Sequence, residues 1–302
     1  MGNAVMVAQR RCSVLSIIGS AAGLMLIPVP AVSADRVLET FRADRFVLDL
    51  AIAKCRSSEC PIQVRLRTGG RIIDRVAVPF AAHSQRATAV TTDAHWGADT
   101  GRKAWATGEE NSHVGTTARL LRLAPRTPAL LVSQLAGFEH LKRNHVLTVP
   151  RAGKLVVAWK AQEGAGPTWS ATEIIGSSDQ QEIVYFYGFF HPAEDEPESL
   201  DVVRLTWKAA RVQETPLPAP SMPLYLLDLG THDTATQARQ ARMANTCLSP
   251  HWVLDAGRFH AGAGGKAVIG TLYATRAAAD QAARTVRRCL PGVNASIVTI
   301  AP

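Results

Sequence analysis

The sequence predicts an exported chain with an N-terminal all-β domain and a C-terminal α+β domain. Three observations lead to this prediction. The first part of the chain is a series of short β-branched and aromatic runs bounded by Gly, Pro, Asp and Ser. A proline-rich segment, 215–223, then interrupts the chain. Beyond it, apolar runs alternate with two Ala- and Arg-rich stretches that have helical spacing.

The first 34 residues, 1–34, have the features of a secretory signal peptide. Arg10 and Arg11 precede an uncharged apolar run, and Val32-Ser33-Ala34 offers the small residues that signal peptidase prefers. A retained membrane anchor is the alternative, because the run is nearly as long as the roughly 20 residues that span a bilayer. We expect cleavage, and hence a mature chain of 35–302 without a stable membrane span.

The four cysteines of the mature chain suit an oxidising compartment, where thiols tend to pair. Cys55 and Cys60 have four residues between them, enough for a small disulfide-closed loop. Cys247 and Cys289 would then pair by elimination. Their spacing matches no zinc site, so we expect neither a metal nor a cofactor.

The charge of the chain is modest, with 33 basic against 25 acidic residues spread along its length. No basic run is dense enough to predict nucleic-acid binding. A basic exported domain could meet anionic wall polymers or lipid headgroups, but a solvated surface explains such an excess as well.

The segment 35–214 is expected to form an antiparallel sandwich or jelly-roll-like domain, since short strands recur every dozen or so residues. Gly69-Gly70 predicts a hairpin turn, and only 128–143 suggests a helix. The expected strands are 46–53, 62–67, 71–78, 87–92, 117–123, 154–161, 182–190 and 201–207.

Signals of catalysis in this domain are weak. No nucleophile elbow occurs, and Ser, His and Asp are too scattered to nominate a triad. The loop 163–170 mixes Gly and Pro with Trp169, whose indole could stack on a sugar; a plain loop with a packed Trp is the alternative. The acidic residues of 194–198 are expected in an exposed loop. We therefore name no catalytic residue.

The tail, 224–302, divides into two similar halves after the linker 215–223. Strand 224–229 ends at Gly230, and Thr234 with Gln237 forms a capping box before a helix that reaches Leu248. The strands 251–259, 266–272 and 294–300 and a second helix from Thr275 to Leu290 complete the pattern. Two βαβ units predict a ferredoxin-like βαββαβ layer with both helices on one face of the sheet and the other face free.

This tail resembles a SPOR (sporulation-related repeat) domain. The resemblance rests on two βαβ repeats whose first and third strands are closed by a glycine, Gly230 and Gly270, and KAVIGTLYATRAAADQAARTVR is the closest match. It implies a bacterial envelope protein, periplasmic or secreted, that binds peptidoglycan glycan strands on the free sheet face.

The resemblance also implies which residues would contact the glycan. They are Asp228, where a glutamine is usual, Thr231 after the glycine, Lys266 four residues before the second glycine, and Ile297 in the last strand. The usual aromatic residue falls at Gly264-Gly265 in this chain. Trp252 is a substitute for it, and core packing is the other explanation of Trp252.

The ferredoxin-like layer bears on the second disulfide as well. Its helices run antiparallel, so Cys247 and Cys289, each at the end of its own helix, should lie beyond the roughly 7 Å that a disulfide permits between Cα atoms. This expectation opposes the pairing obtained by elimination, and a Cys247–Cys289 bond would count against the resemblance.

Three functions follow as hypotheses. The first, which we favour, is a non-enzymatic envelope protein whose tail binds peptidoglycan glycan strands while the β-rich domain binds a ligand or partner, such as an envelope protein. The second is a glycan hydrolase targeted to the wall by its tail, with a carboxylate pair in a cleft. The third is a protein-interaction module without glycan binding.

Overall fold

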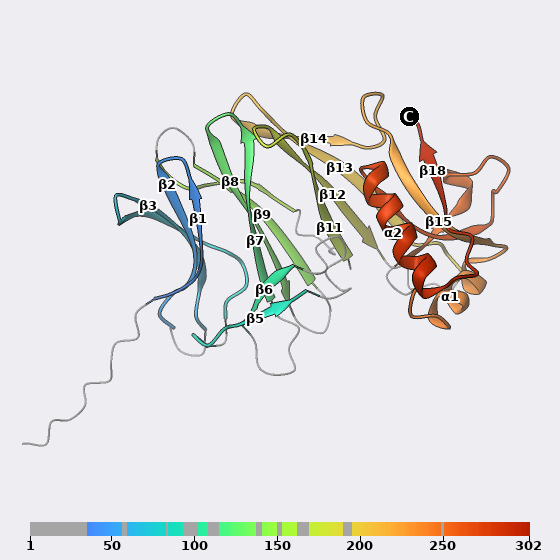
Figure 1. Ribbon diagram of the computed structural model, residues 1–302, viewed down its shortest axis with the longest axis horizontal. Coiled ribbons are helices and arrows are strands. Elements are labelled where there is room, and N and C mark those ends of the chain that lie inside the picture. Colours follow the sequence, from blue (N-terminus) through green and yellow to red (C-terminus); the bar gives the residue numbers. More distant parts are fainter. Residues whose placement is uncertain are drawn as a thin grey trace, which may run out of the picture. The chain divides into compact units, whose positions relative to one another are not determined.

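The computed structural model describes residues 35–302 with gaps. The predicted signal peptide, 1–34, lies outside the described residues, as do the segments 56–58, 83, 93–101, 108–114, 137–140, 150–152, 162–168, 190–194 and 249–250. The segment Ala34–Pro302 forms one compact unit. It is mostly β-strand, arranged in several antiparallel sheets (Figure 1).

Three of the sheets are meanders, in which each strand pairs with its neighbours in sequence. This up-and-down connection differs from the crossovers of the predicted jelly-roll-like alternative. The first sheet contains β1 (Arg36–Ala43), β2 (Phe46–Ile52), β3 (Ile62–Thr68) and β4 (Arg71–Ala77). The second contains β5 (Thr88–Thr91), β6 (Lys103–Ala106), β7 (Gly115–Ala124), β8 (Thr127–Ala136), β9 (Leu141–Thr148) and β10 (Val156–Lys160). The third contains β11 (Trp169–Gly176), β12 (Gln181–Phe189), β13 (Ser199–Lys208) and β14 (Arg211–Pro216).

Buried apolar clusters join successive sheets. Leu48, Leu66 and Val64 of the first sheet share a cluster with Leu130 and Leu147 of the second. The opposite face of the second sheet, with Leu121 and Leu131, packs against Ile183 and Leu205 of the third. Both faces of the second sheet are therefore covered, which explains why strands such as β8 read as continuous apolar runs.

The predicted helix at 128–143 is wrong, because this segment contains β8 and the start of β9. The run ALLVSQL is apolar on both sides since the second sheet is buried on both faces, and such a run has no strand period. The proline in this segment, Pro128, lies at the second position of β8, near a strand end where a missing N–H is tolerated.

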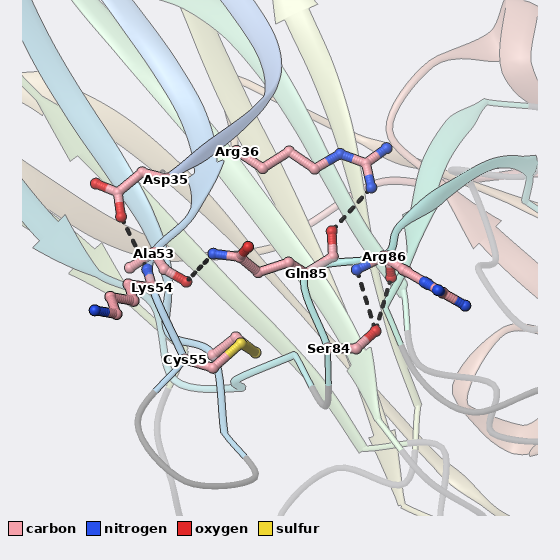
Figure 2. The surroundings of a disulfide bond; sticks show 9 residues. Asp35, Arg36, Ala53, Lys54, Cys55, Ser84, Gln85 and Arg86 are labelled. Atoms are coloured by element: carbon pink, nitrogen blue, oxygen red, sulfur yellow. Dashed lines mark hydrogen bonds between the residues drawn. A yellow bond between two sulfur atoms is a disulfide. The ribbon is translucent and has the colours of Figure 1, made fainter. Parts of the chain in front are cut away.

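The predicted disulfide between Cys55 and Cys60 is present, with the Cα atoms 3.9 Å apart. It closes the connection between β2 and β3, and Figure 2 shows the hydrogen bonds around it. The backbone N–H of Lys54 donates to Asp35 Oδ1 (2.8 Å), and the Arg36 guanidinium donates to the carbonyl of Gln85 (2.8 Å). These contacts attach the start of β1 to the connection between β2 and β3 and to the segment that precedes β5.

The segment predicted as an extended linker, 215–223, holds the end of β14 and a tight turn. The backbones of Ala219 and Met222 exchange hydrogen bonds of 3.2 and 2.7 Å. Met222 is buried, and Leu217 packs against the same apolar cluster. The prolines therefore shape a packed turn here.

The tail contains strands β15 (Leu224–His232), β16 (Trp252–Asp255), β17 (Ala267–Tyr273) and β18 (Ser296–Ile300), with helices α1 (Ala235–Met243) and α2 (Arg276–Cys289) and a short 3-10 turn, Ala256–Arg258. The strand order is β16-β17-β15-β18, and all pairs are antiparallel. Thr234 and Thr275 cap the two helices as predicted, each accepting a backbone N–H of the first turn.

Both glycines that close the tail strands have a structural reason. Gly230 has a φ of 135°, in a bulge of β15, where its N–H donates to Asp228 Oδ1 (2.8 Å). At Gly270, a Cβ would lie 2.3 Å from the carbonyl oxygen of Leu227 on β15. Only glycine permits the bulge at the first position and the close approach at the second.

The two faces of the tail sheet are both buried. One face packs against the helices, with Leu227, Ile269 and Val286 in the shared cluster. The other face, which the sequence predicts to be free, packs against the third sheet, where Leu226 and Val268 meet Phe186. This expectation of a free sheet face is therefore wrong for this chain.

Candidate functional site

The candidate site is a pocket of ≈ 720 Å³ between the third sheet and the tail. Its walls come from β11, the end of β17 and α2. This volume lies within the range of known small-molecule sites. The pocket combines apolar side chains with short hydroxyls and few charges; the described lining residues are Arg102, Arg119, Ala171, Thr172, Glu173, Ile174, Phe186, Thr246, Cys247, His251, Thr271, Leu272, Tyr273, Thr275, Ala278, Gln281, Ala282, Thr285, Val286 and Cys289.

The pocket exists because β16 is short. The last pair of β16 with β17 joins Trp252 to Gly270, so no strand of the described part of the chain pairs with residues 271–273 of β17 on that side. Among the strands that the structure describes, β12 is likewise the one that pairs with β11, the first strand of the third sheet. Two open strand edges therefore border the space, and α2 covers it from the helix side.

Glu173 is the acidic side chain among the described residues that line this pocket. Its carboxylate oxygens lie 3.3 and 3.4 Å from the backbone nitrogen of Ala274, where β17 ends. Burial raises the pKa of Glu173 to about 7, and the backbone hydrogen bond offsets only part of this effect. Near neutral pH this carboxyl is thus divided between its charged and uncharged forms.

Two further titratable groups of the pocket are held in their neutral forms. Burial, with the charge of Glu173 as a second cause, raises the pKa of Tyr273. Burial and the nearby Arg242 lower the pKa of His251 to about 4. The ring of His251 lies with Nδ1 3.1 Å from Thr271 Oγ1. The pocket therefore holds a neutral imidazole and a neutral phenol beside Glu173 at pH 7.

The disulfide between Cys247 and Cys289 forms part of the pocket wall, with the Cα atoms 6.2 Å apart. The pairing obtained by elimination is confirmed, and the distance expected from antiparallel helices is wrong. The reason is the length of α1, which ends at Met243 rather than near Leu248. Cys247 lies in the turn that follows, which brings it to the end of α2.

The residues predicted to contact a glycan do not all lie on one face of the tail sheet. Asp228 Oδ2 lies 2.9 Å from His260 Nε2, and Lys266 forms an exposed ion pair with Asp233 (3.2 Å). Thr231 is exposed on the β15 bulge. Ile297 packs on the helix side of the sheet.

Trp252 lies on the other face, buried to 2% exposure. Its indole fills the space above Gly188 of β12, where a Cβ would lie 2.4 Å from Trp252 Cη2. Trp252 therefore packs in the core, as the second of its two explanations expects. Trp169 belongs to the start of β11; its side chain and the loop 162–168 lie outside the described residues.

Sequence reasoning missed Glu198, which was expected in an exposed acidic loop. Its side chain is buried and accepts hydrogen bonds from the backbone of Val253 (2.8 Å) and from Arg242 Nη1 (2.9 Å). The backbone N–H of Glu198 donates to the carbonyl of Val253 (2.7 Å). Glu198 thus attaches the start of β13 to β16 and α1. No local pattern distinguishes it from its acidic neighbours, because its partners lie far along the chain.

Within the described part of the chain, no helix is long and apolar enough to cross a membrane. Those same residues contain no group of three or more His, Cys, Asp or Glu side chains arranged to hold a metal ion. The two disulfides fit a protein of the periplasm or the extracellular space.

Comparison with known proteins gives no relative. No protein-family model, no curated protein and no solved structure matches this chain.

Proposed function

We propose that this chain is a non-enzymatic binding protein of the bacterial cell envelope that holds a wall glycan in the pocket between β11 and α2. The observation that carries the proposal is the lining of that pocket. Hydroxyls and an amide stand beside apolar surface: Thr271, Thr275, Thr285 and Gln281 alternate with Leu272, Ala278 and Ala282. Sugars present the same combination, with hydroxyls at the rim of the ring and C–H groups on its faces.

The pocket is a better candidate than the tail sheet. The order β18-β15-β17-β16, with α1 and α2 after β15 and β17, supports a ferredoxin-like arrangement and so the resemblance of the tail. The Cys247–Cys289 bond counts against that resemblance. The covered sheet face also leaves a glycan no access to Leu226 or Trp252.

Binding without catalysis agrees with the charges in the pocket. A glycoside hydrolase of the common kind uses two carboxyl groups about 5 to 9 Å apart. Among the described lining residues Glu173 has no second carboxyl beside it. The hydrolase hypothesis therefore has no observation in its favour at this site.

The proposal is tested with residues 35–302 and soluble glycan strands released from purified sacculi, measured by calorimetry. Ala278→Trp places a large ring in the pocket and should abolish binding. Ala277→Trp is the matched control, because Ala277 is exposed on the same helix and does not line the pocket. Equal binding by both variants would refute the pocket as the site.

A second variant distinguishes the tail surface from the pocket. The double substitution Asp228→Ala with Lys266→Ala removes two of the residues that the resemblance nominates. We expect glycan binding to persist in it. Loss of binding in this variant, with Ala278→Trp unaffected, would move the site to the surface around the β15 bulge.

A further inference from the structure

Glu173 is a carboxyl beside which the described part of the chain places no ion-pair partner. Its hydrogen-bond donor among the described residues is the backbone N–H of Ala274, at 3.3 and 3.4 Å from the two oxygens. These distances are longer than the usual 2.9 to 3.0 Å of an N–H···O bond. Most of the acceptor capacity of the carboxylate is therefore unused.

The other charged and titratable groups around Glu173 do not neutralise it. Arg102 and Arg119 line the same pocket, but the charge of neither is among the causes that shift the pKa of Glu173. Tyr273, the last residue of β17 and the neighbour of Ala274, is a neutral phenol, and His251 is a neutral imidazole at pH 7. A buried carboxylate normally lies beside a partner of opposite charge.

The surfaces beside Glu173 suit a cation with an apolar body. Tyr273 contributes an aromatic ring, and no described residue hydrogen-bonds its hydroxyl. Phe186 and Leu272 extend the apolar wall. A carboxylate beside aromatic rings is the usual composition of a site for an ammonium group.

We propose that Glu173 selects a glycan carrying a free amino group, whose ammonium it binds in place of the neutral acetamide of an N-acetylated sugar. This inference rests on the proposed glycan site and names the ligand class within it. The raised pKa of Glu173 supports it, because an ammonium ligand would stabilise the charged form and release the proton that Glu173 carries near neutral pH.

The test compares two oligosaccharides that differ only in acetylation, a glucosamine oligomer and the N-acetylglucosamine oligomer of the same length, with residues 35–302 at pH 6.5. We expect the glucosamine oligomer to bind at least about tenfold more tightly than the acetylated oligomer, because a charge-assisted hydrogen bond contributes a free energy of that size. Calorimetry in two buffers of different ionisation enthalpy should show proton release for the amine and none for the acetylated oligomer.

Glu173→Gln removes the charge but keeps the shape and an oxygen that can accept the Ala274 N–H. We expect it to lose both the preference and the proton release while retaining its near-ultraviolet circular dichroism. Asp179→Asn, at an exposed carboxyl between β11 and β12, is the matched control and should behave as the unmodified chain does.

The outcomes separate the two proposals. Equal binding of the two oligomers by the unmodified chain would overturn the amine selectivity and leave the glycan site standing. A preference that persists in Glu173→Gln would assign the selectivity to another group. Absence of binding for both oligomers would overturn the glycan site, and this inference with it.

Discussion

Glu173 should make the stability of this protein depend on pH in a direction unusual for a carboxyl. Its pKa is raised from 4.5 to about 7, so its contribution to stability is complete below pH 4.5 and is lost as the pH rises through 7. Each pKa unit corresponds to about 1.4 kcal/mol. Between pH 5 and 8 we expect Glu173→Gln to gain roughly 2 kcal/mol relative to the unmodified chain, measured by urea unfolding at each pH.

The comparison with Glu173→Gln is needed because His251 acts in the opposite direction. Its pKa is lowered from 6.5 to about 4, so its contribution is present above pH 6.5 and is lost as the pH falls through 4. His251 is common to both proteins, and its effect cancels in their difference. A difference that stays constant from pH 5 to 8 would show that Glu173 titrates normally.

At the scale of single elements, the contact between β12 and β16 depends on a glycine. Gly188 leaves room for the indole of Trp252, and an added Cβ would lie 2.4 and 2.7 Å from two ring atoms. We expect Gly188→Ala to lower the free energy of unfolding by about 1–3 kcal/mol, as overpacking does. Gly264→Ala, where a Cβ meets nothing within 4 Å, is the control. Equal stability of the two variants would mean that the third sheet and the tail sheet can move apart at this contact at little cost in free energy.

The sequence was informative where an element is amphipathic and misleading where it is covered on both sides. The helix α2 and its Thr275 cap are readable because the cap and the apolar stripe both have local spacing. The strands β8 and β9 were missed because both faces of their sheet are buried. The contacts of Trp252 and Glu198 join β16 to strands earlier in the chain, and such pairings leave no mark on local spacing.

The pocket could not be predicted for the same reason. Ala171 and Glu173 lie about 100 residues before Leu272 and Ala274, and they meet only because the third sheet packs on the tail. The cysteines were the exception. Their even number predicted two bonds, and the length of α1, which the sequence overestimated, decided that the second one forms.

For the whole molecule, the two disulfides should contribute unequally to stability. The chain-entropy model gives about 4 kcal/mol for the loop closed by Cys247–Cys289 and about 2 kcal/mol for that closed by Cys55–Cys60; the sequence separations are 42 and 5. We expect the Ser/Ser replacement of Cys247 and Cys289 to lower the unfolding midpoint in guanidinium by the larger amount. The reverse order would show that the short loop is essential to the first sheet.

The turn at 217–222 connects two parts of the chain that are also held together by an apolar contact between sheets. Pro220 and Ser221 are exposed there, whereas Leu224 and Leu226 just beyond are buried against the third sheet. A chain cut between Pro220 and Ser221 should therefore stay assembled as a split protein. The fragments 35–220 and 221–302, produced together, should elute as one complex in size-exclusion chromatography, whereas 221–302 alone should self-associate through its uncovered sheet.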